Sequence, residues 1–374
     1  MICDVWFAVF SFVYVCLDAA VSVFVLYLQN IECLSIVMNC YLKIISPNKA
    51  KNDIDELMER DGFRNLSVHI GSKGKVSVFF SKLFSVIRLP FVLHKDDVLL
   101  IQYPFKKYYT ALCRIAHMKN ASTVTLIHDL GTFRRHKLTA DQEIERLSHT
   151  DSIIVHNGAM KDWLKEHGCK VRMCELEIFD YLSSSSPLHR HFGHSPRRIV
   201  YAGALGLRKN AFLYDLDKCL DGCVLDIFGR GLDKNIASKW HNIHYHGYLE
   251  SDKFIETVDG DWGLVWDGDS IDACSGNWGE YLRINNPHKT SFYICAGLPV
   301  IIWNQSAMSE FIVENKLGIC VSSLSELSEA LNHVSKEEYD EICASVEAFR
   351  KKLVDGYFFR EAFADACSCM AKRN

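Results

Sequence analysis

The feature that most constrains this chain is a repeated alternation of short apolar runs with helical stretches of ten residues or more. In the first half the apolar runs have strand length and end at polar residues; they are 41–45, 66–70, 98–102, 123–128, 152–156 and 171–176. Helical patterns fill most of the intervals, for example over 106–117 and 139–148. Strands that alternate with helices predict a parallel sheet with crossover helices.

A second alternation follows a clear break in the pattern. Residues 183–187 read SSSSP, and a polar run continues to Arg198, which is typical of a linker. Further apolar runs then appear at 198–201, 224–228, 243–245, 263–266, 300–303 and 319–321. A length of 374 residues fits two domains. We therefore expect an α/β chain with domains at 38–182 and 198–345, a linker at 183–197, and C-terminal helices over 346–374 that can cross back to the first domain.

The first 37 residues form an apolar leader. Residues 1–42 contain no Lys or Arg, and the apolar run over 5–28 is long enough to cross a bilayer. Asp18 interrupts that run, where a carboxylate costs about 2.5–3.5 kcal/mol on insertion scales, and a secretory signal would need a basic start. If the leader spans a membrane, the lysines that follow it keep the main body cytoplasmic. The interpretation we favour is that Met38 is the true start and 1–37 is not part of the mature protein.

Charge and cysteine content argue against several classes of protein. The net charge is −4 and the pI is near 6.5, so a nucleic-acid partner gains no support. Fifteen cysteines occur without a repeated zinc-ligand spacing, which fits a reducing cytosol. Neither half contains GxGxxG after its first strand or a GxxxxGK[ST] motif, which argues against nicotinamide and kinase chemistry.

The stretch 285–303, NNPHKTSFYICAGLPVIIW, carries the sharpest functional signal. Asn285 and Asn286 are favoured helix caps, and Pro287 suits a first helical position. Gly297 can end the helix in the left-handed conformation. Lys289 then falls in the first turn, where the helix dipole disfavours a cation. A lysine beside free backbone N–H groups indicates an anion site, usually for phosphate; the alternative is a side chain that extends into solvent.

In the first half, polar residues follow the strands. Ligand sites of parallel sheets lie at the carboxyl ends of the strands. This rule brings Lys49 and Asp129 to one functional edge, together with Ser46, Tyr103, His128 and Asn157. Asp129 follows a buried strand and is our candidate general base for an acceptor hydroxyl. It could equally cap the helix that follows.

Glycines follow several strands of the second half, where glycine lets a backbone approach a ligand closely. Gly203 precedes two basic residues, although an ordinary turn with solvated charges is the simpler interpretation. Arg230 lies between two glycines at a strand end. That position suits contact with a phosphate or a nucleobase edge as well as it suits a plain turn.

Two acidic residues of the second half are further candidates. Glu310, in a helix that begins near Ser306, could accept both hydroxyls of a ribose; a first helical turn also favours an acid for its own sake. Asp267 and Asp269 suggest a metal, but no second acidic cluster supports one. Hydroxyl binding or turn formation explains Asp267 better, and we expect no bound metal.

Four of these stretches resemble a known family. They are GLVWDGDSIDACSGNWGEYLRINNPHKTSFYICAGLPVI over 263–301, SPNKAKNDIDELM from Ser46, IHDLGTFR from Ile127 and EIFDYL from Glu177. Together they are similar to the bacterial β-1,6-galactofuranosyltransferases, whose structural relatives include glucosyltransferases that extend GlcNAc on serine-rich adhesins. The resemblance covers nearly everything from about Tyr41 onward.

The resemblance implies a GT-B fold, in which two Rossmann-like domains face each other across a cleft. It also implies contacts to UDP from Asn286, Pro287 and Lys289, and from the glycine turn at Gly203. The E-x7-E pattern of many retaining GT-B enzymes is missing, because Ile284 and Phe292 occupy those places. An inverting displacement is therefore favoured.

The resulting hypothesis is a GT-B glycosyltransferase that moves a hexosyl group from a UDP-sugar, with galactofuranose as the candidate sugar. The acceptor would be a carbohydrate or a lipid-linked oligosaccharide in cell-surface polysaccharide assembly. We expect no cofactor beyond the donor, no nucleic-acid partner, and a cytoplasmic location with the inner face of the plasma membrane as an optional contact. Two alternatives stay open: a non-catalytic nucleotide-sugar-binding partner of another transferase, and a GT-B UDP-sugar epimerase. The oligomeric state is not indicated.

Overall fold

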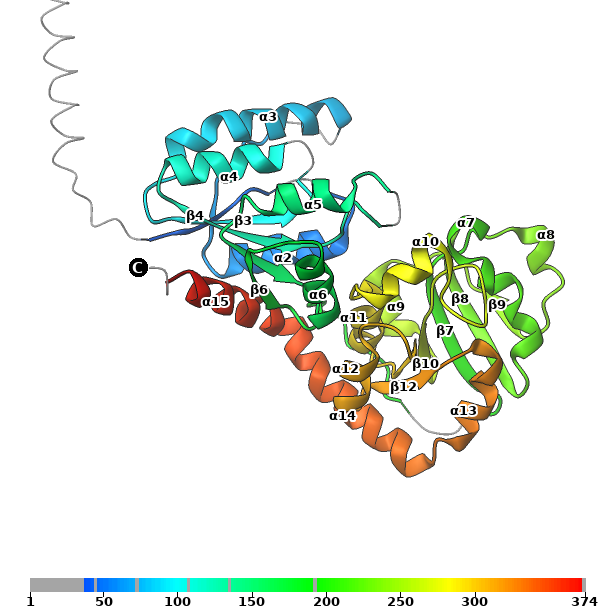
Figure 1. Ribbon diagram of the computed structural model, residues 1–374. Helices are drawn as coiled ribbons and strands as arrows, with labels where there is room; N and C mark the ends of the chain where they lie inside the picture. Colours follow the sequence, from blue (N-terminus) through cyan, green and yellow to red (C-terminus); the bar gives the residue numbers. More distant parts are fainter. Residues whose placement is uncertain are drawn as a thin grey trace, which may run out of the picture.

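A computed structural model describes residues 37–43, 46–70, 74–105, 108–133, 136–190 and 194–371, which form two α/β domains side by side (Figure 1). All but the last residue of the predicted leader lies outside these ranges. Within them, no helix combines the length and the apolar character needed to cross a membrane.

The first domain is built on a six-stranded parallel sheet in the order β2-β1-β3-β4-β5-β6. Its strands are β1 (Asn39–Tyr41), β2 (Arg64–Asn65), β3 (Val98–Tyr103), β4 (Ser122–Ile127), β5 (Ser152–Val155) and β6 (Arg172–Glu175). Its helices are α2 (Lys49–Arg60), α3 (Lys75–Val92), α4 (Tyr109–Met118), α5 (Ala140–Leu147) and α6 (Gly158–Glu166).

Alternate residues of each strand serve opposite faces of this sheet. In β3, Leu99 and Ile101 pack in the cluster that contains α3 and α4, whereas Leu100 packs in the cluster that contains α2. All three side chains are almost fully buried. A strand that is covered on both faces reads as a continuous apolar run, which is why the sequence revealed it.

The predicted strand over 66–70 is wrong. Strand β2 ends at Asn65, and the following residues have no regular structure. Serine hydroxyls of α3 bind their backbone instead: Ser85 Oγ accepts from the Val68 N–H at 2.8 Å, and Ser81 Oγ accepts from the Ile70 N–H at 3.2 Å. The Leu66 N–H still donates to the Tyr41 carbonyl of β1 at 2.9 Å, but beyond it helix side chains satisfy the donors that a strand partner would otherwise have to meet.

The second domain has its own six-stranded parallel sheet, in the order β12-β11-β10-β7-β8-β9. The strands are β7 (Arg197–Ala204), β8 (Cys223–Arg230), β9 (Ile243–Tyr245), β10 (Trp262–Val265), β11 (Val300–Trp303) and β12 (Gly318–Val321). The helices are α7 (Leu207–Asn210), α8 (Lys234–Ala237), α9 (Ser251–Thr257), α10 (Gly276–Gly279), α11 (His288–Cys295), α12 (Ser309–Glu314), α13 (Leu327–His333) and α14 (Lys336–Asp355).

Two connections join the domains. The segment before β7 is held to the second domain by Arg190, whose guanidinium donates to the carbonyls of Val258, Gly260, Ala296 and Gly297. At the other end of the chain, α15 (Tyr357–Ala371) leaves α14 and packs against β5 and β6 of the first domain (Figure 1). The last helix of the sequence is therefore part of the first domain in space.

Candidate functional site

A cavity of about 460 Å³ opens at the carboxyl ends of β7 and β8, beside the start of α11. Strand β7 is the place where the strand order reverses, with β8 and β9 on one side and β10 to β12 on the other. Open α/β sheets bind ligands at such a point. The cavity lining includes the predicted residues Gly203, Arg230 and Lys289, and aromatic side chains from Tyr181, Tyr248 and Phe292.

Lys289 directs its amine inward from the first turn of α11. The Nζ atom donates to Asp267 Oδ1 at 2.6 Å, to the Tyr201 hydroxyl at 2.7 Å and to the Trp266 carbonyl at 3.2 Å. Only 14% of the side chain is exposed, so the alternative of a lysine extending into solvent is wrong. Burial lowers the pKa of Lys289 to about 8, an effect that the Asp267 carboxylate opposes.

Asp267 follows β10 and lies between two lysines. Its Oδ1 pairs with Lys289, and its Oδ2 lies 3.4 Å from the Nζ of Lys209. Lys209 also lines a second cavity of about 860 Å³, together with Asp269 and Trp278. The carboxylate thus supplies the negative charge that makes a lysine tolerable in the first turn of α11. Within the described ranges, no group of three or more His, Cys, Asp or Glu side chains is arranged to hold a metal.

The floor of the cavity is bare backbone. Gly229 has a φ of +149°, and a Cβ atom there would lie 1.8 Å from the Gly203 carbonyl oxygen. Gly203 has a φ of +157°, and its Cβ would lie 3.2 Å from Cε of Lys289. A side chain at Gly203 would crowd the lysine, and one at Gly229 would collide with the neighbouring strand, so glycine keeps this edge of the cavity open.

Arg230 forms the rim with a residue that the sequence analysis missed. Its guanidinium carbon lies 3.9 Å from the centre of the Tyr248 ring, a cation–π arrangement on the exposed side of the cavity. Tyr248 directly follows Gly247, which takes a φ of +79° after β9. The available sequence signal was Gly247, a glycine directly after a strand. The residue that lines the cavity is the next one along the chain, Tyr248.

Asn286 connects the two domains. Its Nδ2 donates to the carbonyls of His156 and Glu177, at 2.7 Å and 2.8 Å, and its Oδ1 accepts from Asn157 Nδ2 at 2.6 Å. The predicted cap is therefore wrong: Pro287 takes the N-cap position, and the amide of Asn286 is used by the first domain. The predicted UDP contacts of Asn286 and Pro287 stay predictions.

Comparison with known proteins identifies relatives of this chain. Family models described as the N-terminal and C-terminal domains of glucosyltransferase 3-like proteins match residues 45–178 and 199–366. The β-1,6-galactofuranosyltransferase WbbI of Escherichia coli is 33% identical over 75% of this chain and 82% of its own. Glucosyltransferase 3 of Streptococcus gordonii is 24% identical over 85% and 92% of the two chains.

The chain belongs to the glucosyltransferase 3-like family. A solved structure supports the fold: the lipopolysaccharide outer core galactosyltransferase WaaB superimposes with a TM-score of 0.57, at 12% identity, covering 88% of this chain and 99% of its own. The predicted GT-B arrangement of two Rossmann-like domains is confirmed. This glucosyltransferase 3-like protein is a glycosyltransferase of the GT-B type.

Two predicted residues of the glucosyltransferase 3-like protein lie apart from the cavity. Glu310 is exposed in the first turn of α12, which begins at Ser309 and not near Ser306. Asp129 follows β4 in the first domain. It does not cap the next helix, because Thr139 caps α5 with its own side chain. Neither Glu310 nor Asp129 is among the residues that line the cavity, and their proposed roles stay predictions.

Lys49 and His288 meet at the cavity wall through Tyr181. Lys49 Nζ donates to Asp53 Oδ1 at 2.7 Å and to the Leu182 carbonyl at 2.8 Å, and it lies 4.5 Å from the centre of the Tyr181 ring. His288, which the sequence analysis passed over although it adjoins Lys289, stacks on the same ring at 5.0 Å. Burial lowers the pKa of His288 to about 4, so this wall presents a neutral imidazole whose buried Nε2 has no hydrogen-bond partner.

Proposed function

We propose that this glycosyltransferase moves a hexosyl group from a UDP-sugar to a carbohydrate acceptor, with galactofuranose as the first candidate sugar. The name of the E. coli relative supports that choice, and the name of the S. gordonii relative makes glucose the comparison. The acceptor would be a saccharide or a lipid-linked oligosaccharide of a growing cell-surface polysaccharide. The donor would need no further cofactor.

The observation that carries the proposal is the position of Lys289. Its ammonium group borders a cavity whose floor is bare backbone at Gly203 and Gly229, so a bulky anion can approach it closely. A diphosphate has the charge and the size for that place. Asp267 would hold the amine in position, as it does here at 2.6 Å.

The chemistry follows from the charge that develops on the leaving group. When the bond between the sugar and the diphosphate breaks, negative charge grows on the departing UDP. A cation already oriented by Asp267 and Tyr201 stabilises that charge without reorganising. This is work that a metal ion does in other transferases, which is why we propose a metal-independent reaction.

The remaining groups would orient the two substrates. The nucleoside would lie along Arg230 and Tyr248, where a flat aromatic and a guanidinium are exposed together. The acceptor hydroxyl would approach from the first domain and lose its proton to a base there, with Asp129 as our nominee. Attack opposite to the leaving group would invert the anomeric centre.

A donor screen tests the proposal. UDP-galactofuranose and UDP-glucose would each be supplied with and without a saccharide acceptor, and released UDP and glycosylated product measured together. The proposal expects product and UDP in equal amounts, with the anomeric configuration inverted by NMR. Donor binding without turnover would instead indicate a binding protein. Free UDP with an epimerised sugar, formed when no acceptor is present, would indicate an epimerase.

A further inference from the structure

Helix α3 has two apolar sides, and protein covers only one of them. The inner side packs in the core of the first domain, where Val86 and Leu89 are buried. The outer side carries an apolar row, here called the outer stripe: Val76, Phe80, Phe84, Ile87 and Phe91. Their spacings of four, four, three and four place them within an arc of about 80° on a helix of 3.6 residues per turn. Between 42% and 81% of each is exposed.

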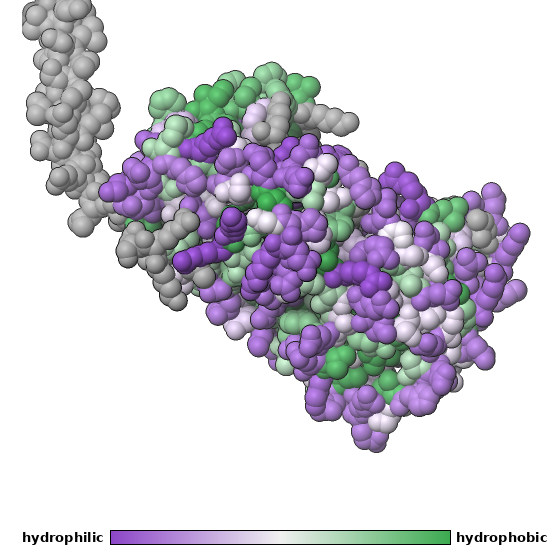
Figure 2. Space-filling model, viewed as in Figure 1, coloured by the Kyte–Doolittle hydropathy of each residue, from purple (hydrophilic) through white to green (hydrophobic). Residues whose placement is uncertain are grey.

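The outer stripe forms a continuous surface. Figure 2 shows hydrophobic atoms gathered along the part of the molecule that α3 occupies in Figure 1, at the far end of the first domain from the second domain. Phe79 lies beside the stripe and is also 42% exposed. Scattered exposed apolar residues are ordinary, but an unbroken row on one helix marks an interaction site.

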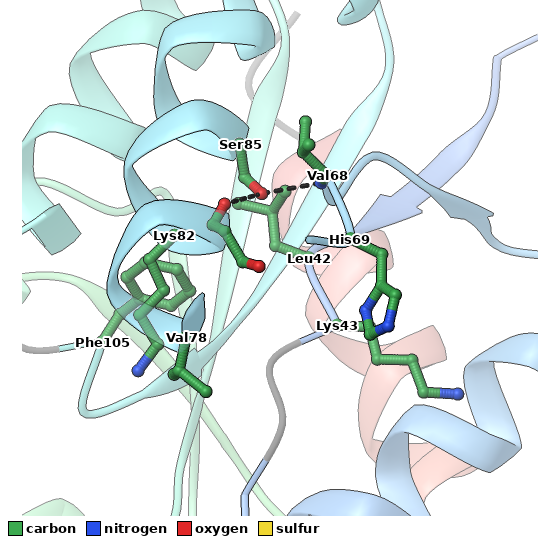
Figure 3. A pocket seen from close by; sticks show the side chains of 9 residues that line it. Leu42, Lys43, Val68, His69, Val78, Lys82, Ser85 and Phe105 are labelled. Atoms are coloured by element: carbon green, nitrogen blue, oxygen red, sulfur yellow. Dashed lines mark hydrogen bonds between the residues drawn. The ribbon is translucent and has the colours of Figure 1, made fainter. Parts of the chain in front are cut away.

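The inner side of α3 is firmly held, so the outer stripe is not a sign of a loosely placed helix. Ser85 accepts from the Val68 N–H and donates to the Ser81 carbonyl at 2.6 Å (Figure 3). The small cavity beside these bonds measures about 20 Å³, room for about one water molecule. It cannot receive a sugar or an acyl chain, so the interaction site is the outer face alone.

The surrounding sequence is strongly basic. Residues 62–128, which contain α3 and α4, hold ten Lys and Arg residues but only two acids, a net charge of +8 in a chain whose total is −4. Of the two acids, Asp97 is buried and paired with Arg64 at 2.7 Å. Arg88 is exposed on α3 itself. An apolar stripe with an exposed arginine on the same helix, within a basic stretch of sequence, is the composition of helices that lie in a membrane interface.

We propose that the outer stripe of α3 docks the protein on a membrane surface that contains anionic lipid headgroups. The phenylalanines would enter the boundary between headgroups and acyl chains, and the basic residues would face the negative leaflet. Charge favours this occupant over a second copy of the chain, because two copies that met here would bring two like-charged basic segments together. The inference does not depend on the donor sugar, because the cavity lies in the other domain.

Vesicle binding tests the inference with the full chain. Co-sedimentation would compare vesicles of phosphatidylcholine alone with vesicles that also contain phosphatidylglycerol. We expect binding to the anionic vesicles only, and salt should weaken it. Phe84→Ser should weaken it about tenfold, because the variant has less apolar surface to bury in the membrane. Arg88→Glu should weaken it as well. The matched control is Val313→Ser, an exposed apolar residue of α12 in the second domain, 56% exposed, which should bind as wild type.

Hydrogen exchange identifies the segment involved. Anionic vesicles should slow exchange in peptides from Lys75–Val92, and light scattering without vesicles should give the same mass for wild type and Phe84→Ser. Three results would overturn the inference: equal vesicle binding by Phe84→Ser and wild type, a change of oligomer size in that variant, or binding that disappears when the chain starts at Met38. The last would assign membrane binding to residues 1–37. Transfer to a water-soluble acceptor should not change in Phe84→Ser, which separates this test from that of the donor site.

Discussion

The ammonium group of Lys289 and the carboxylate of Asp267 meet at 2.6 Å beside the cavity, and both side chains are largely shielded from water. The pair makes Lys289 part of the fold as well as a candidate for the reaction. A useful experiment must therefore separate the two contributions.

Lys289→Ala should lose UDP affinity by about 10- to 150-fold, because a charge-assisted hydrogen bond contributes about 1.5–3 kcal/mol. It should also lower the free energy of unfolding by about 1–3 kcal/mol, since the buried Asp267 carboxylate loses its 2.6 Å ion pair while the second lysine, Lys209, stays at 3.4 Å. Titration calorimetry with UDP and chemical denaturation measure the two effects.

The double variant Lys289→Gln with Asp267→Asn separates these effects. It removes both charges of the pair, so most of the stability should return while UDP binding stays weak. Lys316→Ala, which removes a surface lysine paired with Glu341, serves as the control and should leave both quantities unchanged. If the double variant regained UDP affinity along with stability, Lys289 would be a structural residue only.

UDP affinity should fall as the pH rises above about 8. The pKa of Lys289 is lowered to about 8, so the amine is charged below that pH and neutral above it. A bound diphosphate favours the charged form, and binding above pH 8 should therefore take up a proton. Calorimetry between pH 7 and pH 9.5 in buffers of different ionisation enthalpy measures both effects. Lys289→Arg, which stays charged, should show no such decline; a parallel decline in that variant would point to another group.

Gly229→Ala should destabilise the second domain by about 3 kcal/mol or more, because the new methyl group meets the backbone of Gly203 at 1.8 Å and cannot be accommodated by a side-chain movement. Gly247→Ala is the matched control. Gly247 also has a positive φ, of +79°, but nothing lies within 4 Å of its Cβ position. It should cost only about 1 kcal/mol of backbone strain. Equal melting temperatures for the two variants would contradict the close approach of β7 and β8.

Asn286→Ala should loosen the junction of the domains. Three hydrogen bonds between the Asn286 amide and the first domain are lost, and the buried carbonyl of His156 loses a donor, so the free energy of unfolding should fall by about 2–3 kcal/mol. Small-angle scattering should show a broader distribution of domain separations. Asn315→Ala, a surface asparagine of the second domain, is the control. Unchanged scattering and stability would show that the bridge is dispensable.

Chelation should leave transfer intact, since we propose that Lys289 and not a metal balances the charge of the leaving group. Activity would be measured before and after EDTA, and again after Mg²⁺ or Mn²⁺ is added. A loss in EDTA that either cation restores would contradict the proposed mechanism.

Sequence reasoning worked best where the structure depends on neighbours along the chain. The position of Lys289 follows from the helix and glycine signals around it, and Gly297 does take the left-handed conformation, with a φ of +70°. The strands that are buried on both faces could also be predicted from the sequence, because each one is a continuous apolar run. The segment 66–70 failed because serine side chains of α3 replaced its strand partner.

The partners of Asn286 could not have been predicted from local pattern. His156 lies 130 positions away and Glu177 lies 109 positions away, and both come from the other domain. The stacking of Tyr248 on Arg230 depends in the same way on β8 and β9 lying side by side. Contacts between distant elements are set by how those elements pack, and one sequence does not display that.

The crossing of α15 onto the first domain sets an order of events during synthesis. Phe359, Phe363 and Ala366 are buried, and α15 covers β5 and β6. Until the ribosome releases the last helix, the first domain keeps the β5 and β6 part of one face of its sheet uncovered, while the second domain can already close. A nascent chain of this kind needs protection longest in the domain that is made first. A message truncated just before α15 would yield a protein whose second domain is complete and whose first domain is not.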